Sequence, residues 1–265
     1  AMESLCHAVQ NAGADLGVIF DADCDRAALV DGAGRAVNRN RLIALVSAVL
    51  LQETPGATIV TDSVTSAGLE TFLIARGGTL HRFKRGYRNV IDEALRLNAA
   101  GVFCPLAIET SGHAALLENS FLDDGMYLVT RLILTAVRQR RKGDTLFALI
   151  DGLQEPAESV EVRAAIRAED FRPVGEQAIG AVSDAARGTP GWSVDPEGRE
   201  GVRVHCGGKD SWFLLRLSVH DPLLVLNAES DRLGGVRAML SPLRALLSRF
   251  SQLDLSLLDA HLSNH

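Results

Sequence analysis

The strongest constraint on the fold is an alternation of short apolar runs with helical segments in the first 150 residues. Apolar residues recur at helical spacing in the longer segments, and the runs between them have strand length. The expected strands lie at 58–61, 80–83 and 102–108, and the expected helices at 41–53, 66–76, 88–97 and 126–140. Such alternation is typical of an α/β domain whose mixed, mainly parallel sheet is flanked by helices. Pro105 indicates that the third strand is bent or lies at an edge.

The pattern changes after a predicted linker that begins at Gly152. Beyond it, strands are grouped between two helices, so a smaller α+β domain is expected at the C-terminus. Its predicted strands lie at 160–166, 201–205 and 212–218, with a continuation after Pro222. One apolar face of the terminal helix is formed by Val236, Leu240, Leu243, Leu247 and Phe250.

The first 39 residues predict a helix that ends at Gly13, a strand over 16–20 and a second strand over 27–30. The chain opens inside what looks like an amphipathic helix, without a signal peptide, which favours a missing beginning. Three aspartates, Asp21, Asp23 and Asp25, lie in the loop between the two strands.

Composition excludes several classes of partner. The net charge of −6, from 27 basic and 33 acidic residues, gives no field that would attract nucleic acid. The most apolar stretch, 42–51, is about half of the roughly 20 residues that a membrane-spanning helix needs. The four cysteines lie far apart, which argues against a zinc cluster or a disulfide framework and favours reduced thiols.

The alternating carboxylates of the acidic loop suit Mg²⁺, which prefers hard oxygen ligands. A plain solvated acidic turn is the simpler alternative. An EF-hand is excluded, because this chain has Arg26 and Gly32 where that loop needs Gly at position 6 and Glu at position 12. A haloacid-dehalogenase-type phosphatase with Asp21 as nucleophile is a minor alternative. Such enzymes usually have Thr or Val at the position that Asp25 holds in this chain, which argues against it.

The loop from Phe20 to Arg26 resembles the D-x-D-x-D-R metal loop of the α-D-phosphohexomutases, in their phosphoglucomutase/phosphomannomutase branch of plants, algae and bacteria. Within this loop, Ala22 stands in place of the usual Gly or Thr. The resemblance extends over almost the whole chain. It implies that the three aspartates bind the metal and that Arg26 is catalytic. An ion pair within the loop is the alternative for Arg26.

The segment from Ile108 to His113 is similar to the family's sugar-recognition loop, G-E-x-S-G-H. The resemblance implies that Glu109 and Ser111 hydrogen-bond hexose hydroxyls, which fits two polar side chains that point the same way in an extended loop. His113 is expected to assist phosphate or proton transfer, with a surface histidine as the alternative.

Two further segments predict anion binding. Lys84, Arg85 and Arg88 lie between a strand and a helix N-terminus, where anions are favoured, so a phosphosugar is expected to bind there. Lys84 is also a candidate catalytic residue. In the last domain, the segment from Arg216 to Pro222 resembles the family's phosphate loop R-x-S-x-T-E-P. Arg216, Ser218 and His220 are the expected ligands there, and His220 and Asp221 depart from the family pattern.

The resemblance implies a mutase that interconverts hexose 1-phosphate and hexose 6-phosphate through a phosphoserine, with Mg²⁺ and a hexose 1,6-bisphosphate as intermediate and activator. The family's phosphoserine motif is missing, so the chain is expected to lack an N-terminal phosphoserine region. Residues 1–39 are then the end of domain 2, 40–152 domain 3 and 153–265 domain 4.

A non-catalytic phosphohexose-binding or regulatory protein of the same fold fits the sequence equally well. Glu109 and Ser111 suit glucose and mannose alike, so the preferred sugar stays open. The reduced thiols and the resemblance favour the cytoplasm or the plastid stroma.

Overall fold

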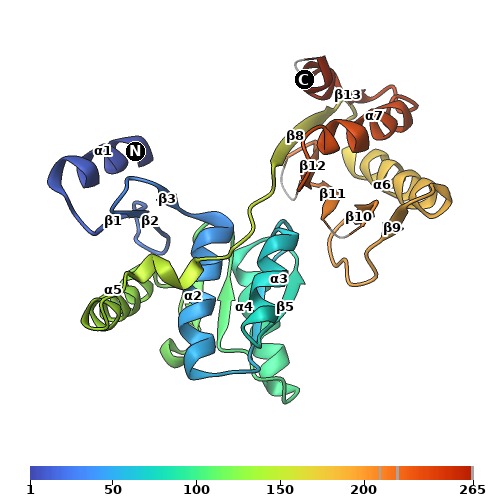
Figure 1. The fold of residues 1–265 in the computed structure, drawn as a ribbon. Helices are drawn as coiled ribbons and strands as arrows, with labels where there is room; N and C mark the ends of the chain where they lie inside the picture. Colours follow the sequence, from blue (N-terminus) through green and yellow to red (C-terminus); the bar gives the residue numbers. More distant parts are fainter. Residues whose placement is uncertain (209, 219–220, 264–265) are drawn as a thin grey trace. The chain divides into compact units, whose positions relative to one another are not determined.

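The computed structural model describes residues 1–208, 210–218 and 221–263. The chain divides into two compact units, the first made of residues 1–65 and 69–154 and the second of 66–68 and 155–265 (Figure 1). Among the described residues, no helix is long and apolar enough to cross a membrane.

Unit 1 opens with a helix and a three-stranded antiparallel sheet in the order β1-β2-β3. The elements are α1 (Met2–Ala12), β1 (Leu16–Phe20), β2 (Ala27–Asp31) and β3 (Ala36–Val37). The helix ends at Gly13, whose φ of 60° is left-handed and free of strain only for glycine. The acidic loop therefore connects two strands, as the sequence predicted.

The second sheet of unit 1 has the order β5-β4-β6-β7, with β4 parallel to β5 and β6, and β7 antiparallel to β6. This mixed sheet with its flanking helices confirms the predicted α/β class. The elements are α2 (Arg39–Glu53), β4 (Thr58–Asp62), α3 (Ala67–Ala75), β5 (Thr79–Phe83), α4 (Tyr87–Ala99), β6 (Leu106–Ile108) and β7 (Ala114–Leu116). The predicted strand over 102–108 is too long, because β6 begins only after Pro105, which has no N–H to donate.

Both faces of this sheet are covered. Ile59, Leu106 and Ile108 share a core with the apolar helix α2, whose residues 42–51 are all buried. Val60 and Ala107, which alternate with them, pack with Val90 and other residues of α4. The apolar run at 42–51 is therefore explained by burial between layers.

Unit 1 ends with a long helix that starts beside the acidic loop. After the 3-10 turn η1 (Leu117–Asn119), helix α5 (Gly125–Arg141) is capped by Asp124, which accepts a hydrogen bond from the backbone N of Tyr127 at 2.8 Å. A second 3-10 turn, η2 (Leu146–Ile150), follows it.

Unit 2 is a six-stranded antiparallel sheet in the order β13-β8-β12-β11-β10-β9, with helices packed on one face. Its elements are β8 (Glu158–Ile166), α6 (Phe171–Gly188), β9 (Trp192–Val194), β10 (Val202–Cys206), β11 (Ser211–Leu217), β12 (Leu223–Ser230), α7 (Gly235–Leu247), β13 (Leu253–Asp254) and α8 (Ser256–Ser263). The expected α+β class is confirmed. The predicted terminal helix is too long, because α7 ends at Leu247 and Phe250 lies beyond it, before β13 and α8.

Candidate functional site

The acidic loop brings three carboxylates together. Ligand oxygens of Asp21, Asp23 and Asp25 lie within 4.8 Å of one another. Arg26 holds the first of them, because its Nε donates to Asp21 Oδ2 at 2.6 Å and its backbone N to Asp21 Oδ1 at 3.2 Å. Cys24 makes the turn with a φ of 63°.

The charges of the acidic loop favour the binding of a cation. Desolvation and the neighbouring carboxylates raise the pKa of Asp25, although His113 opposes them. Desolvation also acts on Asp21, but the hydrogen bonds from Arg26 outweigh it and lower the pKa of that carboxyl. Oδ1 of Asp25 is buried and has no hydrogen-bond partner in the described part of the chain. The donor set and this oxygen therefore fit a hard divalent cation such as Mg²⁺.

The predicted sugar loop follows β6, and two of its side chains, Glu109 and Ser111, are hydrogen-bonded to each other. Glu109 is only 4% exposed, and its Oε1 accepts a hydrogen bond from the backbone N of Gly86 at 2.6 Å. Its Oε2 accepts from Ser111 Oγ at 3.2 Å. The two residues expected to bind sugar hydroxyls are thus brought together. The Glu109 carboxylate also connects the sugar loop to residues 84–88, the basic loop.

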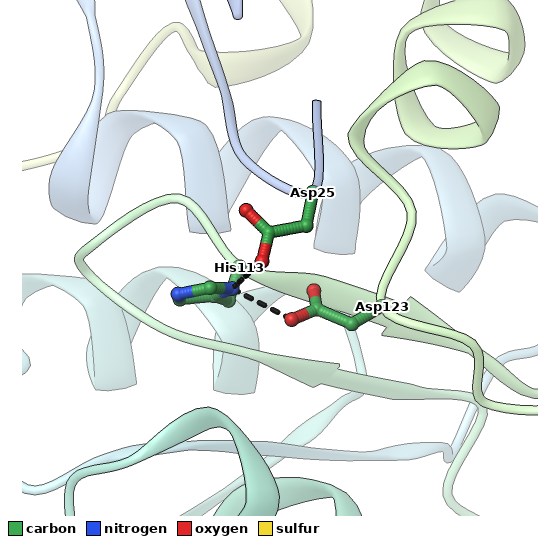
Figure 2. Close-up of side chains that lie close together, drawn as sticks. All are labelled: Asp25, His113 and Asp123. Carbon is green, nitrogen blue, oxygen red and sulfur yellow. Dashed lines mark hydrogen bonds and ion pairs between the residues drawn. The ribbon is translucent and has the colours of Figure 1, made fainter. Parts of the chain in front are cut away.

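His113 lies between the acidic loop and α5 (Figure 2). Its Nδ1 is 2.6 Å from Asp123 Oδ2 and 3.7 Å from Asp25 Oδ2, and its ring stacks on Tyr87 with centroids 5.1 Å apart. A backbone bridge also pairs His113 with Arg26. Burial lowers the pKa of His113, but the hydrogen bond and charge of Asp123, with Asp25, outweigh it and raise the pKa. Asp123 is not predictable from the sequence, where its only signal is that it precedes the helix cap Asp124.

In the basic loop, the side chain of Arg85 lies near a buried carboxylate, whereas Lys84 and Arg88 are exposed. Arg85 Nε lies 3.6 Å from Oδ2 of Asp62, a carboxylate with no exposed surface at the end of β4. Lys84 is exposed, and Arg88, also exposed, has Asp92 at 4.0 Å. Asp62 also accepts hydrogen bonds from Thr110 Oγ1 at 2.6 Å and from its backbone N at 3.3 Å. This carboxylate, which was not among the residues predicted from the sequence, links the loops after β4, β5 and β6.

In unit 2, the expected phosphate ligands Arg216 and Ser218 lie at the end of β11 and just beyond it. Arg216 is 8% exposed, and its Nη1 is 3.6 Å from Glu200 Oε1. Ser218 Oγ accepts a hydrogen bond from the backbone N of Asp221 at 3.3 Å. The third candidate, His220, lies outside the described residues.

Comparison with known proteins identifies a family. Residues 38–155 match the family model "Phosphoglucomutase/phosphomannomutase, alpha/beta/alpha domain III". The chain is 28% identical to a phosphomannomutase/phosphoglucomutase of Pseudomonas putida, over 87% of this chain and 46% of that protein. It is 31% identical to a phosphoglucosamine mutase of Anaeromyxobacter dehalogenans, over 79% of this chain and 45% of the other.

A solved structure with the same fold extends the match into both units. The phosphoglucomutase/phosphomannomutase family protein from Burkholderia thailandensis aligns with a TM-score of 0.76 and 24% identity, over 94% of this chain and 50% of that one. The chain spans about half the length of the curated relatives it matches. The family model identifies residues 38–155 as the alpha/beta/alpha domain III of the phosphoglucomutase/phosphomannomutase family.

Proposed function

We propose that the chain is the metal-, sugar- and phosphate-binding part of a phosphohexomutase, an intramolecular phosphotransferase that interconverts hexose 1-phosphate and hexose 6-phosphate. The observation that carries this proposal is the meeting of three loops in unit 1. The acidic loop pairs with the sugar loop through the bridge between Arg26 and His113, and the sugar loop is bonded to the basic loop through Glu109 and Gly86. The curated relatives named above are mutases for phosphohexoses.

The domain assignment is part of the proposal. Residues 1–39 are the end of domain 2 and carry the metal loop. Residues 40–152 are domain 3 and carry the sugar loop, and residues 153–265 are domain 4 with the phosphate loop. The phosphoserine then belongs to an N-terminal region, which is a partner that this sequence does not contain.

Asp21, Asp23 and Asp25 are the residues that would hold Mg²⁺. The three converging carboxylates support this assignment, as does Oδ1 of Asp25, which is buried without a hydrogen bond in the described part of the chain and has only the Arg26 Nε at 3.6 Å as an ion-pair partner. A structural neighbour, the N-acetylphosphoglucosamine mutase of Aspergillus fumigatus, was solved with GlcNAc-6P and magnesium, and it aligns at 11% identity with a TM-score of 0.54. When bound, the ion would neutralise charge on the phosphoryl group.

Different residues of the chain then bind the sugar, stabilise the phosphate charge and orient the metal ligands. Glu109 and Ser111 exchange their mutual hydrogen bond for bonds to hexose hydroxyls, which costs little because one charge-assisted bond replaces another. The basic loop, with Lys84, Arg85 and Arg88, stabilises phosphate charge. Arg26 keeps Asp21 oriented and, like Lys84 and His113, is a candidate catalytic residue.

Arg216 and Ser218 bind the phosphate that is not transferred, and His220 is proposed as a third ligand. For Arg216 this means that phosphate oxygens replace Glu200 as the facing anion. The sugar bisphosphate made during the reaction serves as intermediate and activator. Another structure of the Aspergillus fumigatus enzyme holds glucose 1,6-bisphosphate, which is the chemistry expected here.

A non-catalytic phosphohexose-binding protein is the second candidate, because Ser111, the serine of the sugar loop, donates its hydrogen bond to Glu109. The cysteines are free thiols, which fits the cytoplasm as the proposed compartment. The curated relatives named above are bacterial, so they give no support to the plastid stroma.

Reconstitution tests the proposal. The chain alone, with Mg²⁺ and glucose 1,6-bisphosphate, is expected not to form glucose 6-phosphate from glucose 1-phosphate, because the covalent nucleophile is missing. Supplying the N-terminal region of a relative, fused or added in trans, is expected to restore turnover in a coupled assay. An Asp23→Ala chain is the matched control and should stay inactive. Turnover by the isolated chain would contradict the assignment of the nucleophile, and hexose phosphate binding without restored turnover would favour the binding protein.

A further inference from the structure

The ring of His113 is held in one orientation by a carboxylate that has no assigned role. Asp123 uses both of its oxygens, because Oδ2 accepts from His113 Nδ1 at 2.6 Å and Oδ1 accepts from the backbone N of Ala114 at 3.1 Å. The side chain of Asp123 is mostly buried, so the bond to the ring is shielded from water. A carboxylate in this place favours the imidazole tautomer with its proton on Nδ1.

The second ring nitrogen points away from both carboxylates (Figure 2). Asp25 is not an alternative partner that fixes the ring, because its Oδ2 is 3.7 Å from Nδ1, beyond hydrogen-bond distance. The stack with Tyr87 at 5.1 Å restricts rotation of the ring plane. With Nδ1 occupied, Nε2 is the nitrogen left to face a ligand, and its lone pair makes it an acceptor when the ring is neutral.

We propose that Asp123 is a positioning residue, which holds the Nδ1–H tautomer of His113 so that Nε2 accepts a hydrogen bond from a hydroxyl of the bound phosphosugar. The phosphosugar part of this inference rests on the proposed function. The orientation of the ring does not, since it follows from the contacts of Asp123 alone. The same logic applies wherever a buried carboxylate selects the tautomer of a functional histidine.

An Asp123→Asn variant tests the proposal with little change in shape. The backbone N–H of Ala114 requires an oxygen at the Oδ1 position, so the amide NH₂ is directed at His113 Nδ1. That nitrogen must then accept, and the proton moves to Nε2. The variant side chain therefore keeps both hydrogen bonds, to His113 and to Ala114, but the tautomer of His113 is reversed. Asp124→Asn is the matched control, because it makes the same chemical change at the next residue, and Asn is as good a helix cap as Asp.

The tautomer is read by ¹⁵N–¹H correlation spectra of the full chain at a pH at which the imidazole is neutral. The wild type and Asp124→Asn are expected to show predominantly Nδ1–H for His113, and Asp123→Asn predominantly Nε2–H, a change of at least tenfold in the tautomer ratio. Titration with glucose 6-phosphate should then show binding weakened about three- to tenfold in Asp123→Asn alone. Thermal unfolding of all three proteins controls for loss of structure.

Two results would overturn the inference. One is an unchanged tautomer in Asp123→Asn, which would mean that the ring is oriented by something else. The other is a reversed tautomer with wild-type affinity for glucose 6-phosphate, which would mean that Nε2 does not face the sugar. If the wild type itself fails to bind glucose 6-phosphate, the proposed function and the sugar contact both fail, while the tautomer measurement still decides whether Asp123 positions the ring.

Discussion

At the scale of single residues, Cys24 has a backbone conformation that suits another amino acid. Its φ of 63° is left-handed, which strains a residue with a β-carbon but not glycine. We expect Cys24→Gly to raise the free energy of unfolding by about 0.5–1 kcal/mol, since relief of strain exceeds the added chain entropy. Chemical denaturation measures this.

The control for that substitution is Cys6→Gly, within helix α1. There the same change places glycine in a helix interior and is expected to lower stability by about 1 kcal/mol. Equal destabilisation by both variants would show that the conformation of Cys24 carries no strain.

Asp62 makes stability depend on pH. Burial is the largest cause that raises its pKa, to about 6 from 3.8. Between these values the folded chain keeps a proton that the unfolded chain has lost, so the stabilisation is present below about pH 4 and is lost as the pH rises through 6. The difference corresponds to about 3 kcal/mol.

Asp62→Asn removes this titration. The stability of the wild type minus that of Asp62→Asn should therefore fall by about 3 kcal/mol between pH 4 and pH 7, as measured by urea denaturation. A flat difference curve would show that Asp62 keeps an ordinary pKa in the folded chain.

The candidate residues that sequence could find are those in short local patterns. The three aspartates, Glu109 and His113 belong to motifs within a few residues of one another. Asp62 was missed because its partner Thr110 is 48 residues away. Asp123 was missed because only the fold places it beside the histidine, and the burial of Arg216 against Glu200 depends on tertiary packing in the same way.

At the scale of elements, the N-terminus of α5 supports the acidic loop. The backbone N of Gly125 donates to Cys24 O at 3.1 Å, and a β-carbon there would lie 2.8 Å from that oxygen and 2.9 Å from the carbonyl carbon of Arg26. Both are backbone atoms, so neither can turn aside. Gly125 is therefore required for the close approach of helix and loop.

Gly125→Ala is expected to displace the acidic loop, lower stability by about 1–3 kcal/mol and weaken Mg²⁺ binding at least tenfold. Gly180→Ala in α6 is the control, because a β-carbon there meets nothing within 4 Å. It should gain about 0.5–1 kcal/mol and leave metal binding unchanged. Calorimetric titration of both variants with Mg²⁺ decides the point, and equal affinities would contradict a supporting role for Gly125.

Elements were predictable where periodicity is strong and neighbouring signals agree. Strands β1, β2, β4 and β5 and helices α2, α4 and α5 lie close to their expected ranges. The two-residue strands β3 and β13 have no pattern of their own, because their pairing partners define them. Helix α8 was missed because the apolar face of α7 runs on to Phe250 in sequence, past the true helix end.

At the scale of the whole molecule, the two units have separate cores. The apolar residues of unit 1 pack around α2 and α4, and those of unit 2 pack between its sheet and α6, α7 and α8. All three aspartates of the acidic loop, with His113 and Gly125, belong to unit 1. Metal binding is therefore expected to be a property of unit 1.

A fragment of residues 1–154 is expected to fold and to bind Mg²⁺ within about threefold of the affinity of the full chain. An Asp23→Ala fragment serves as the control and should lose that binding. Calorimetry on the fragment and on the full chain makes the comparison. A folded fragment without metal affinity would show that the proposed ligand set is incomplete.

Strand β1 has a consequence for handling the protein. It lies at the edge of its sheet and consists of Leu-Gly-Val-Ile-Phe, an apolar sequence without a charge or a proline. Such an edge offers unpaired backbone groups to any other strand and is where association between copies begins. We therefore expect the solubility of the chain to depend on this edge, and a lysine at Ile19 would be the first substitution to try against aggregation.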